Sequence, residues 1–87
     1  MSLDTNIYKI SSNEDQIIFT RIGTTHNEDL TEDLQDECQQ EWHVESACGF
    51  IGELPTETLE EVLSNYPDFK LKEPLEENSF YRISISY

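Results

Sequence analysis

The chain has 87 residues, with 19 Asp and Glu against 5 Lys and Arg, and a formal net charge of −14 at pH 7. This length fits one small domain over residues 1–87, too small for a deep catalytic cleft. The charge repels nucleic acid and anionic lipid, so we expect no direct binding to nucleic acid or membrane and attraction to basic proteins. The hydrophobic share of 36% is sufficient for a folded core.

Targeting signals and metal ligands are sparse in the sequence. No apolar run reaches the roughly 18–20 residues of a membrane span, and residues 1–10 lack the layout of a secretory signal. We therefore expect a cytoplasmic protein in which Cys38 and Cys48 are reduced and buried. His43 lies midway between them, but this spacing matches no common zinc site, so no metal or other cofactor is predicted.

Two β-rich runs near the start predict a β-hairpin. Residues 7–10 and 17–22 are rich in isoleucine and aromatic side chains, and the polar residues 11–15 between them form the expected turn. Gly23 is expected to end the second strand, because glycine interrupts β-structure.

The next segment predicts an acidic helix over residues 28–42, with residues 24–27 offering side chains that can cap its start. Apolar side chains recur every four residues and are expected to face the core: Leu30, Leu34, Cys38 and Trp42. The other faces are almost entirely acidic, with Glu28, Asp29, Glu32, Asp33, Asp36, Glu37 and Glu41. The acids near the C-terminal end oppose the helix dipole, so helix stability alone does not account for them.

One helix and three strands are expected in the rest of the chain. Residues 44–51 have β-type character, and a second helix is expected over residues 55–66. Its core-facing positions follow helical spacing: Leu59, Val62, Leu63 and Tyr66. Residues 69–72 and 80–87 are predicted as strands, and in the second one Tyr81, Ile83, Ile85 and Tyr87 alternate with polar residues. The predicted order is ββαβαββ, an α+β fold with an antiparallel-rich sheet of about five strands and two helices.

Acidic and basic residues are separated along the chain. Residues 22–69 include no Lys or Arg in 48 positions, while thirteen carboxylates lie between Glu28 and Asp68. The basic residues all fall in predicted strands: Lys9, Arg21, Lys70, Lys72 and Arg82. Because a surface built only for solubility mixes charge signs, this pattern favours a surface that binds a basic partner.

The spacing of acids on the first helix is similar to that of phosphates along DNA. Side chains four residues apart on a helix are about 6 Å apart, close to two nucleotide steps of ~3.4 Å each. Two rows have this spacing: Glu28, Glu32 and Asp36, and Asp29, Asp33 and Glu37. The sequence therefore predicts a protein that imitates DNA toward the Lys and Arg side chains of a DNA-binding protein.

Short motifs between residues 29 and 68 add to this interpretation. They are Asp29-Leu30-Thr31, Glu45-Ser46, Leu54-Pro55, Glu60-Glu61-Val62-Leu63 and Asn65-Tyr66-Pro67-Asp68. Together they resemble the phage inhibitors of uracil-DNA glycosylase, small acidic proteins that occupy the DNA-binding groove of that enzyme. The resemblance implies that Glu45, Ser46, Glu57 and Glu61 contact the target. It also implies that Val62 and Leu63 help to line an apolar pocket for a protruding enzyme side chain.

Catalytic groups are few, which favours a binding protein over an enzyme. The chain has 2 His and no Gly-rich phosphate loop, nucleophile elbow or Ser-His-Asp spacing. The first interpretation is a phage-encoded inhibitor, monomeric or homodimeric, that acts in the host cytoplasm on a uracil-DNA glycosylase, a CRISPR effector or a restriction system. The second is an immunity protein that neutralises a basic nuclease toxin, and the third is an acidic assembly subunit. Duplex DNA distinguishes the first two, because a DNA mimic must compete with it.

Overall fold

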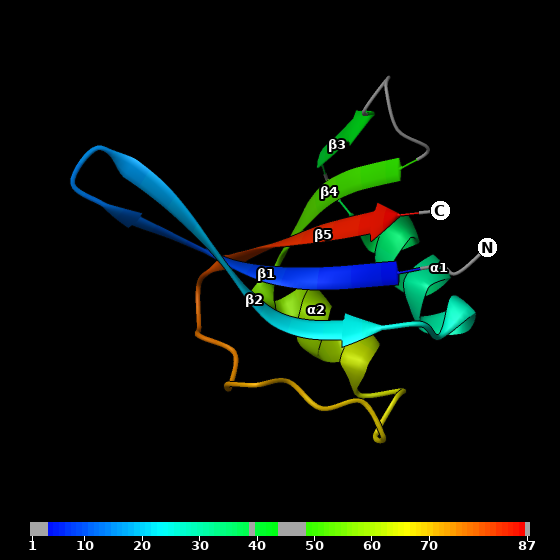
Figure 1. The fold of residues 1–87 in the computed structure, drawn as a ribbon. Coiled ribbons are helices and arrows are strands. Elements are labelled where there is room, and N and C mark those ends of the chain that lie inside the picture. Colours follow the sequence, from blue (N-terminus) through cyan, green and yellow to red (C-terminus); the bar gives the residue numbers. More distant parts are fainter. Residues whose placement is uncertain (1–3, 39, 44–48, 87) are drawn as a thin grey trace.

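One antiparallel sheet in the order β2-β1-β5-β4-β3 organises the chain in the computed structural model, which describes residues 4–38, 40–43 and 49–86. Its long strands are β1 (Asp4–Asn13), β2 (Gln16–Thr25), β4 (Gly49–Pro55) and β5 (Phe80–Ser86), and the four-residue β3 (Gln40–His43) lies at one edge. Helices α1 (Glu28–Glu37) and α2 (Thr56–Leu63) cover one face of the sheet (Figure 1). The chain is thus a small α+β domain.

The order of the elements differs from the predicted ββαβαββ. The observed order is ββαββαβ, because a strand replaces the end of the expected first helix and residues 69–72 form no strand. Neither α1 nor α2 has the length and apolar character needed to span a bilayer.

The β-hairpin is confirmed, with longer strands and a tighter turn than expected. The two strands pair from Thr5 with Thr25 to Asn13 with Gln16, so only two residues remain in the turn. The first of these, Glu14, has a φ of 56°, in the left-handed region. The expectation that Gly23 ends the second strand is wrong, since β2 continues two residues further.

Helix α1 begins where the sequence predicts and ends earlier. The side-chain oxygen of Asn27 accepts hydrogen bonds from the backbone N–H groups of Asp29 at 2.9 Å and Leu30 at 3.3 Å, which caps the start. At the other end, Cys38 is already extended, with φ −66° and ψ 130°. Pairing of β3 with β4 supplies backbone hydrogen bonds that a longer helix would otherwise make. The expected helical position of Glu41 is therefore wrong, because it lies in β3.

Residues 69–72 were expected to form a strand but instead lie irregularly against the edge of β2. A Cβ atom added to Gly23 would lie 2.9 Å from Phe69 Cζ and 3.0 Å from Leu71 Cδ2, so these two side chains press on the backbone of β2. The N–H of Lys72 donates to the carbonyl of Ile22 at 2.8 Å. This part of the sheet edge is covered without a further strand, which reduces the exposed backbone available for pairing.

Helix α2 ends at Leu63, three residues before the expected end, and its first residue is anchored to the loop before β5. The Thr56 hydroxyl donates to the carbonyl of Glu76 at 2.6 Å, and the N–H of Ser79 donates to the same hydroxyl at 3.1 Å.

The Glu76 carboxylate also receives a hydrogen bond from Lys9 of β1 at 2.5 Å. This hydrogen bond is the main reason that the pKa of Lys9 is raised.

The core lies between the sheet and the two helices. In β5 the expected alternation is confirmed over the described residues, with Tyr81, Ile83 and Ile85 buried. The other buried hydrophobic side chains are Ile7, Ile22, Leu30, Leu34, Phe50, Leu54, Leu59 and Val62. The helices carry none of the Lys and Arg residues, although Lys70 and Lys72 lie in a loop and not in the strands expected for them.

Candidate functional site: an acidic groove between the helices

The outward face of α1 carries six exposed carboxylates in ten residues: Glu28, Asp29, Glu32, Asp33, Asp36 and Glu37. Both rows with four-residue spacing lie entirely within this helix, which is about 15 Å long at 1.5 Å per residue. Since α1 ends at Glu37, the predicted seventh acid, Glu41, is not part of the helical face.

The buried side of α1 determines which way its acids point. Leu30, Thr31 and Leu34 are buried against the sheet. The hydroxyl of Thr31 shares a 2.6 Å hydrogen bond with the hydroxyl of Thr5 on β1, and both side chains are buried. Because these contacts fix the rotation of the helix about its axis, the carboxylates are directed away from the sheet.

A groove of about 220 Å³ runs between the two helices. It is lined by Asp33, Asp36, Glu37, Thr58, Glu61, Val62 and Asn65. Four of these residues are acids, three from α1 and one from α2, and the packing of the helices brings them to one place. Neither Thr58 nor Asn65 was predicted as a site residue, because helical spacing alone does not show which side of α2 faces α1.

One carboxylate of the groove is held by a tyrosine. The Tyr66 hydroxyl donates a short hydrogen bond to Asp33 Oδ2. This hydrogen bond, together with burial and the nearby carboxylates of Asp33, Asp29 and Glu32, raises the pKa of Tyr66 to about 12. The raised pKa extends the pH range in which the hydroxyl is protonated and can hold the Asp33 carboxylate in place.

The acids of α1 and α2 take part in none of the ion pairs formed among the described residues. Those ion pairs join Lys9 to Glu73 and Glu76, and Arg82 to Glu53 at 3.0 Å, while His26 Nδ1 lies 2.8 Å from Asp4 Oδ1. The last turn of α1 also has no basic residue to offset the helix dipole. The negative charge of the groove is thus balanced by no Lys or Arg of the described chain.

The remaining predicted site residues are spread over different environments. Glu57 is exposed at the start of α2, beside Glu60 and Glu77 in a separate depression. Val62 is only 6% exposed and belongs to the hydrophobic core, although it also lines the acidic groove, and Leu63 packs partly against the same core. Their role in lining a pocket for an enzyme side chain stays a prediction. The predicted contacts Glu45 and Ser46 lie outside the described residues.

In residues 4–38, 40–43 and 49–86, no three His, Cys, Asp or Glu side chains are grouped in a way that could hold a metal ion. Cys48 lies outside these ranges, so the expectation that it is reduced stays a prediction.

The chain matches no protein-family model, and comparison with curated proteins and with solved structures also gives no match. The fold and the groove define a small α+β protein with one sign of charge on its helical face. The resemblance to uracil-DNA glycosylase inhibitors therefore remains a prediction from short motifs.

Proposed function

We propose that this protein is a binding-only inhibitor that presents its acidic helical face to the nucleic-acid-binding surface of a basic host protein. The observation that carries the proposal is the groove in which acids of both helices converge: Asp33, Asp36, Glu37 and Glu61. Their charges have no Lys or Arg partner among the described residues, so they are available to a partner protein.

The groove acts through carboxylates that are already in place before binding. Lys and Arg side chains that contact phosphates in the partner pair with these carboxylates, preferably in charge-assisted hydrogen bonds. Asp33 is oriented in advance by Tyr66, which lowers the ordering cost of binding. The field of the whole chain, with a formal charge of −14, accelerates the encounter at low salt.

The regular spacing on α1 favours imitation of DNA over simple attraction of opposite charges. Both rows of acids, each spanning two helical turns, stay within α1. In this proposal the partner is a DNA-handling protein, such as a uracil-DNA glycosylase, a CRISPR effector or a restriction enzyme. Duplex DNA and this protein then exclude each other from one surface of the partner.

Affinity capture tests the proposal directly. The immobilised protein is exposed to a bacterial lysate at low salt, and bound proteins are eluted first with duplex DNA and then with high salt. The expected result is a DNA-handling protein in the DNA eluate, identified by mass spectrometry. A specific partner that duplex DNA does not release contradicts DNA imitation and supports the immunity-protein interpretation.

A charge-matched pair of variants then tests the groove. The first variant combines Asp36→Asn, Glu37→Gln and Glu61→Gln, and the control combines Glu14→Gln, Asp68→Asn and Glu77→Gln. All six residues are exposed, and each variant loses three negative charges. We expect the groove variant to bind the captured partner much more weakly and with a shallower salt dependence, and the control to bind almost normally. Equal loss in both variants would show that only net charge matters.

A further inference from the structure

The turn end of the β1–β2 hairpin extends beyond the rest of the sheet. Strand β1 pairs with β5 only from Asp4 to Lys9, but it continues to pair with β2 as far as Asn13. Figure 1 shows this end of the hairpin projecting away from the helices and the other strands. We call residues 10–20 the hairpin arm. A two-stranded hairpin without further packing is marginally stable in water, so an unsupported arm of this length calls for an explanation.

The arm exposes large apolar side chains on a free strand edge. Ile17 is 67% exposed, and Ile18 and Phe19 are each 41% exposed. Strand β2 is the outermost strand of the sheet on this side, and residues 16–20 contain neither charge nor proline. Charged residues and prolines on an edge strand are two devices by which proteins protect that edge from pairing, and residues 16–20 have neither. The edge is therefore suited to pair with another strand.

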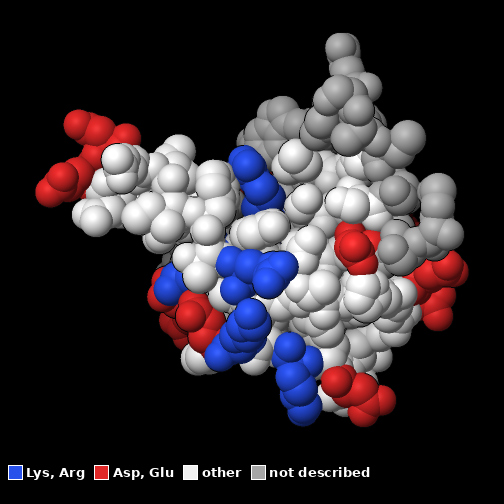
Figure 2. Space-filling model, viewed as in Figure 1, with Lys and Arg blue, Asp and Glu red and all other residues white. Residues whose placement is uncertain are grey.

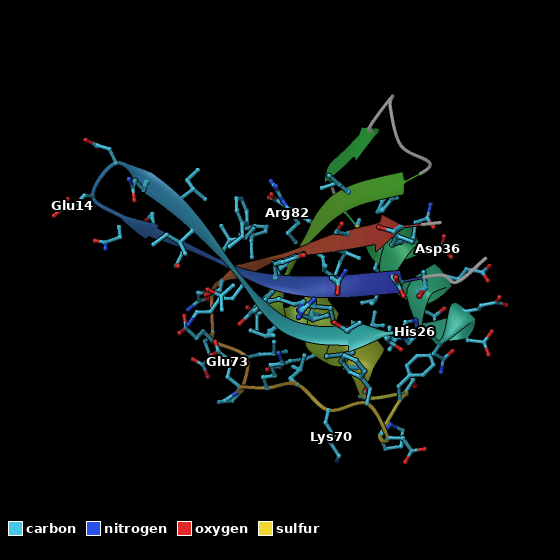
Figure 3. The ribbon with its side chains drawn as sticks, in the orientation of Figure 1. Glu14, His26, Asp36, Lys70, Glu73 and Arg82 are labelled. Carbon is cyan, nitrogen blue, oxygen red and sulfur yellow. The ribbon has the colours of Figure 1, made fainter. Side chains whose placement is uncertain are left out.

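The charges of the arm indicate which strand pairs with this edge of β2. Glu14 and Asp15 make its tip acidic, whereas Arg21 and Arg82 lie at its base. Figure 2 shows acidic groups at the tip and a band of Lys and Arg groups beside the base, and Figure 3 labels Glu14 and Arg82 at these two places. Two such arms placed antiparallel bring the acidic tip of each to the basic base of the other.

One antiparallel register satisfies the apolar and the charged residues together. If Ile18 lies opposite Ile18 of a second copy, then Ile17 lies opposite Phe19 and Asp15 lies opposite Arg21. Each of the last two pairs forms twice, because a two-fold axis relates the copies. Phe19 already contacts Arg82, whose guanidinium lies 4.2 Å from the ring centroid. Aromatic with β-branched pairs and opposite-charge pairs are both favourable across strands.

We propose that the chain forms a homodimer in which the β2 edges of two hairpin arms pair antiparallel about Ile18. The interface buries the exposed apolar side chains of the arm and continues the sheet from one copy into the other. It uses no residue of the acidic groove, so a dimer keeps both grooves available. The proposal does not depend on the identity of the partner that the groove binds.

Sedimentation velocity from micromolar to near-millimolar concentration tests the dimer. We expect a species of about twice the chain mass of 10.2 kDa. Asp15→Arg and Arg21→Asp each place like charges opposite one another twice, so each raises the dimer dissociation constant about tenfold or more. The double variant restores opposite charges and the dimer, and a mixture of the two single variants forms a heterodimer.

Two further variants separate this interface from general charge effects and from misfolding. Lys70→Asp changes the net charge as Arg21→Asp does, but Lys70 lies outside residues 15–21, which pair in the proposed register, so this variant should leave the dimer intact. Ile18→Lys places two like charges at the two-fold axis and should give a monomer with an unchanged circular dichroism spectrum. A chain that is monomeric at every concentration overturns the proposal. So does a dimer that none of the arm variants weakens.

Discussion

The hydroxyl of Tyr66, just after α2, donates a hydrogen bond to the carboxylate of Asp33 on α1. This contact joins the two elements that form the groove and orients one of its four acids. The sequence predicts Tyr66 as a core-facing residue of the second helix, but α2 ends at Leu63, before Tyr66. In the structure it packs partly against the core while its hydroxyl reaches the acidic face.

The first prediction concerns the titration of Tyr66. Its pKa of about 12 in the folded protein is above the ordinary value of 10.0, so the protonated form favours folding. This contribution is complete below pH 10 and is lost as the pH rises toward 12. In ultraviolet titrations of phenolate absorbance, the difference between wild type and Tyr66→Phe isolates this group. We expect Asp33→Asn to lower its pKa toward 10, and a normal pKa in wild type would contradict the hydrogen bond.

The second prediction concerns the effect of the α1 helix dipole on the stability of the fold. Glu37→Lys places a positive charge in the last turn, which favours the helix dipole and should raise the free energy of unfolding by about 0.3–1 kcal/mol. Glu28→Lys makes the same charge change in the first turn and should lower it by a similar amount. Urea denaturation measures both. Changes of the same sign would show that net charge, not the dipole, determines stability here.

The third prediction concerns the buried hydrogen bond between Thr5 and Thr31. Each single change to valine leaves the other hydroxyl buried without this partner and should cost about 1–3 kcal/mol. The double variant replaces both hydroxyls by methyl groups, so it should cost clearly less than the sum of the two. Thermal and urea denaturation of the four proteins gives the coupling free energy. Additive effects would show that the two hydroxyls do not interact.

The fourth prediction concerns the close approach of Gly52 on β4 to the end of α1. A Cβ atom at this position would lie 2.7 Å from Cys38 Sγ and 2.9 Å from Phe50 Cε1. Gly52→Ala should therefore destabilise the fold by about 1–3 kcal/mol through overpacking. Gly49→Ala is the matched control, because within the described residues its Cβ would meet the Ile85 carbonyl alone, at 3.0 Å. We expect a smaller loss for the control, and an equal loss would remove the special role of Gly52.

Local patterns in the sequence were sufficient to predict the hairpin, a helix cap within residues 24–27 and the alternation of buried residues in β5. Each of these features depends on residues close together in the chain, where side-chain spacing and capping chemistry act directly. The acidic face of α1 was also predictable, since helical spacing places its carboxylates opposite Leu30 and Leu34. The separation of acidic from basic residues along the chain can be read directly from the sequence.

Contacts between distant residues accounted for what sequence patterns missed. The four-residue apolar spacing that continues to Trp42 predicts a longer α1, but residues 40–43 pair with β4 and leave the helix. Phe69 and Leu71 have strand-like character, yet they pack on Gly23 of β2. The groove depends on how α1 packs against α2, and the projecting arm depends on where β5 stops pairing with β1. Such features arise from packing and strand pairing across many residues, which local periodicity does not encode.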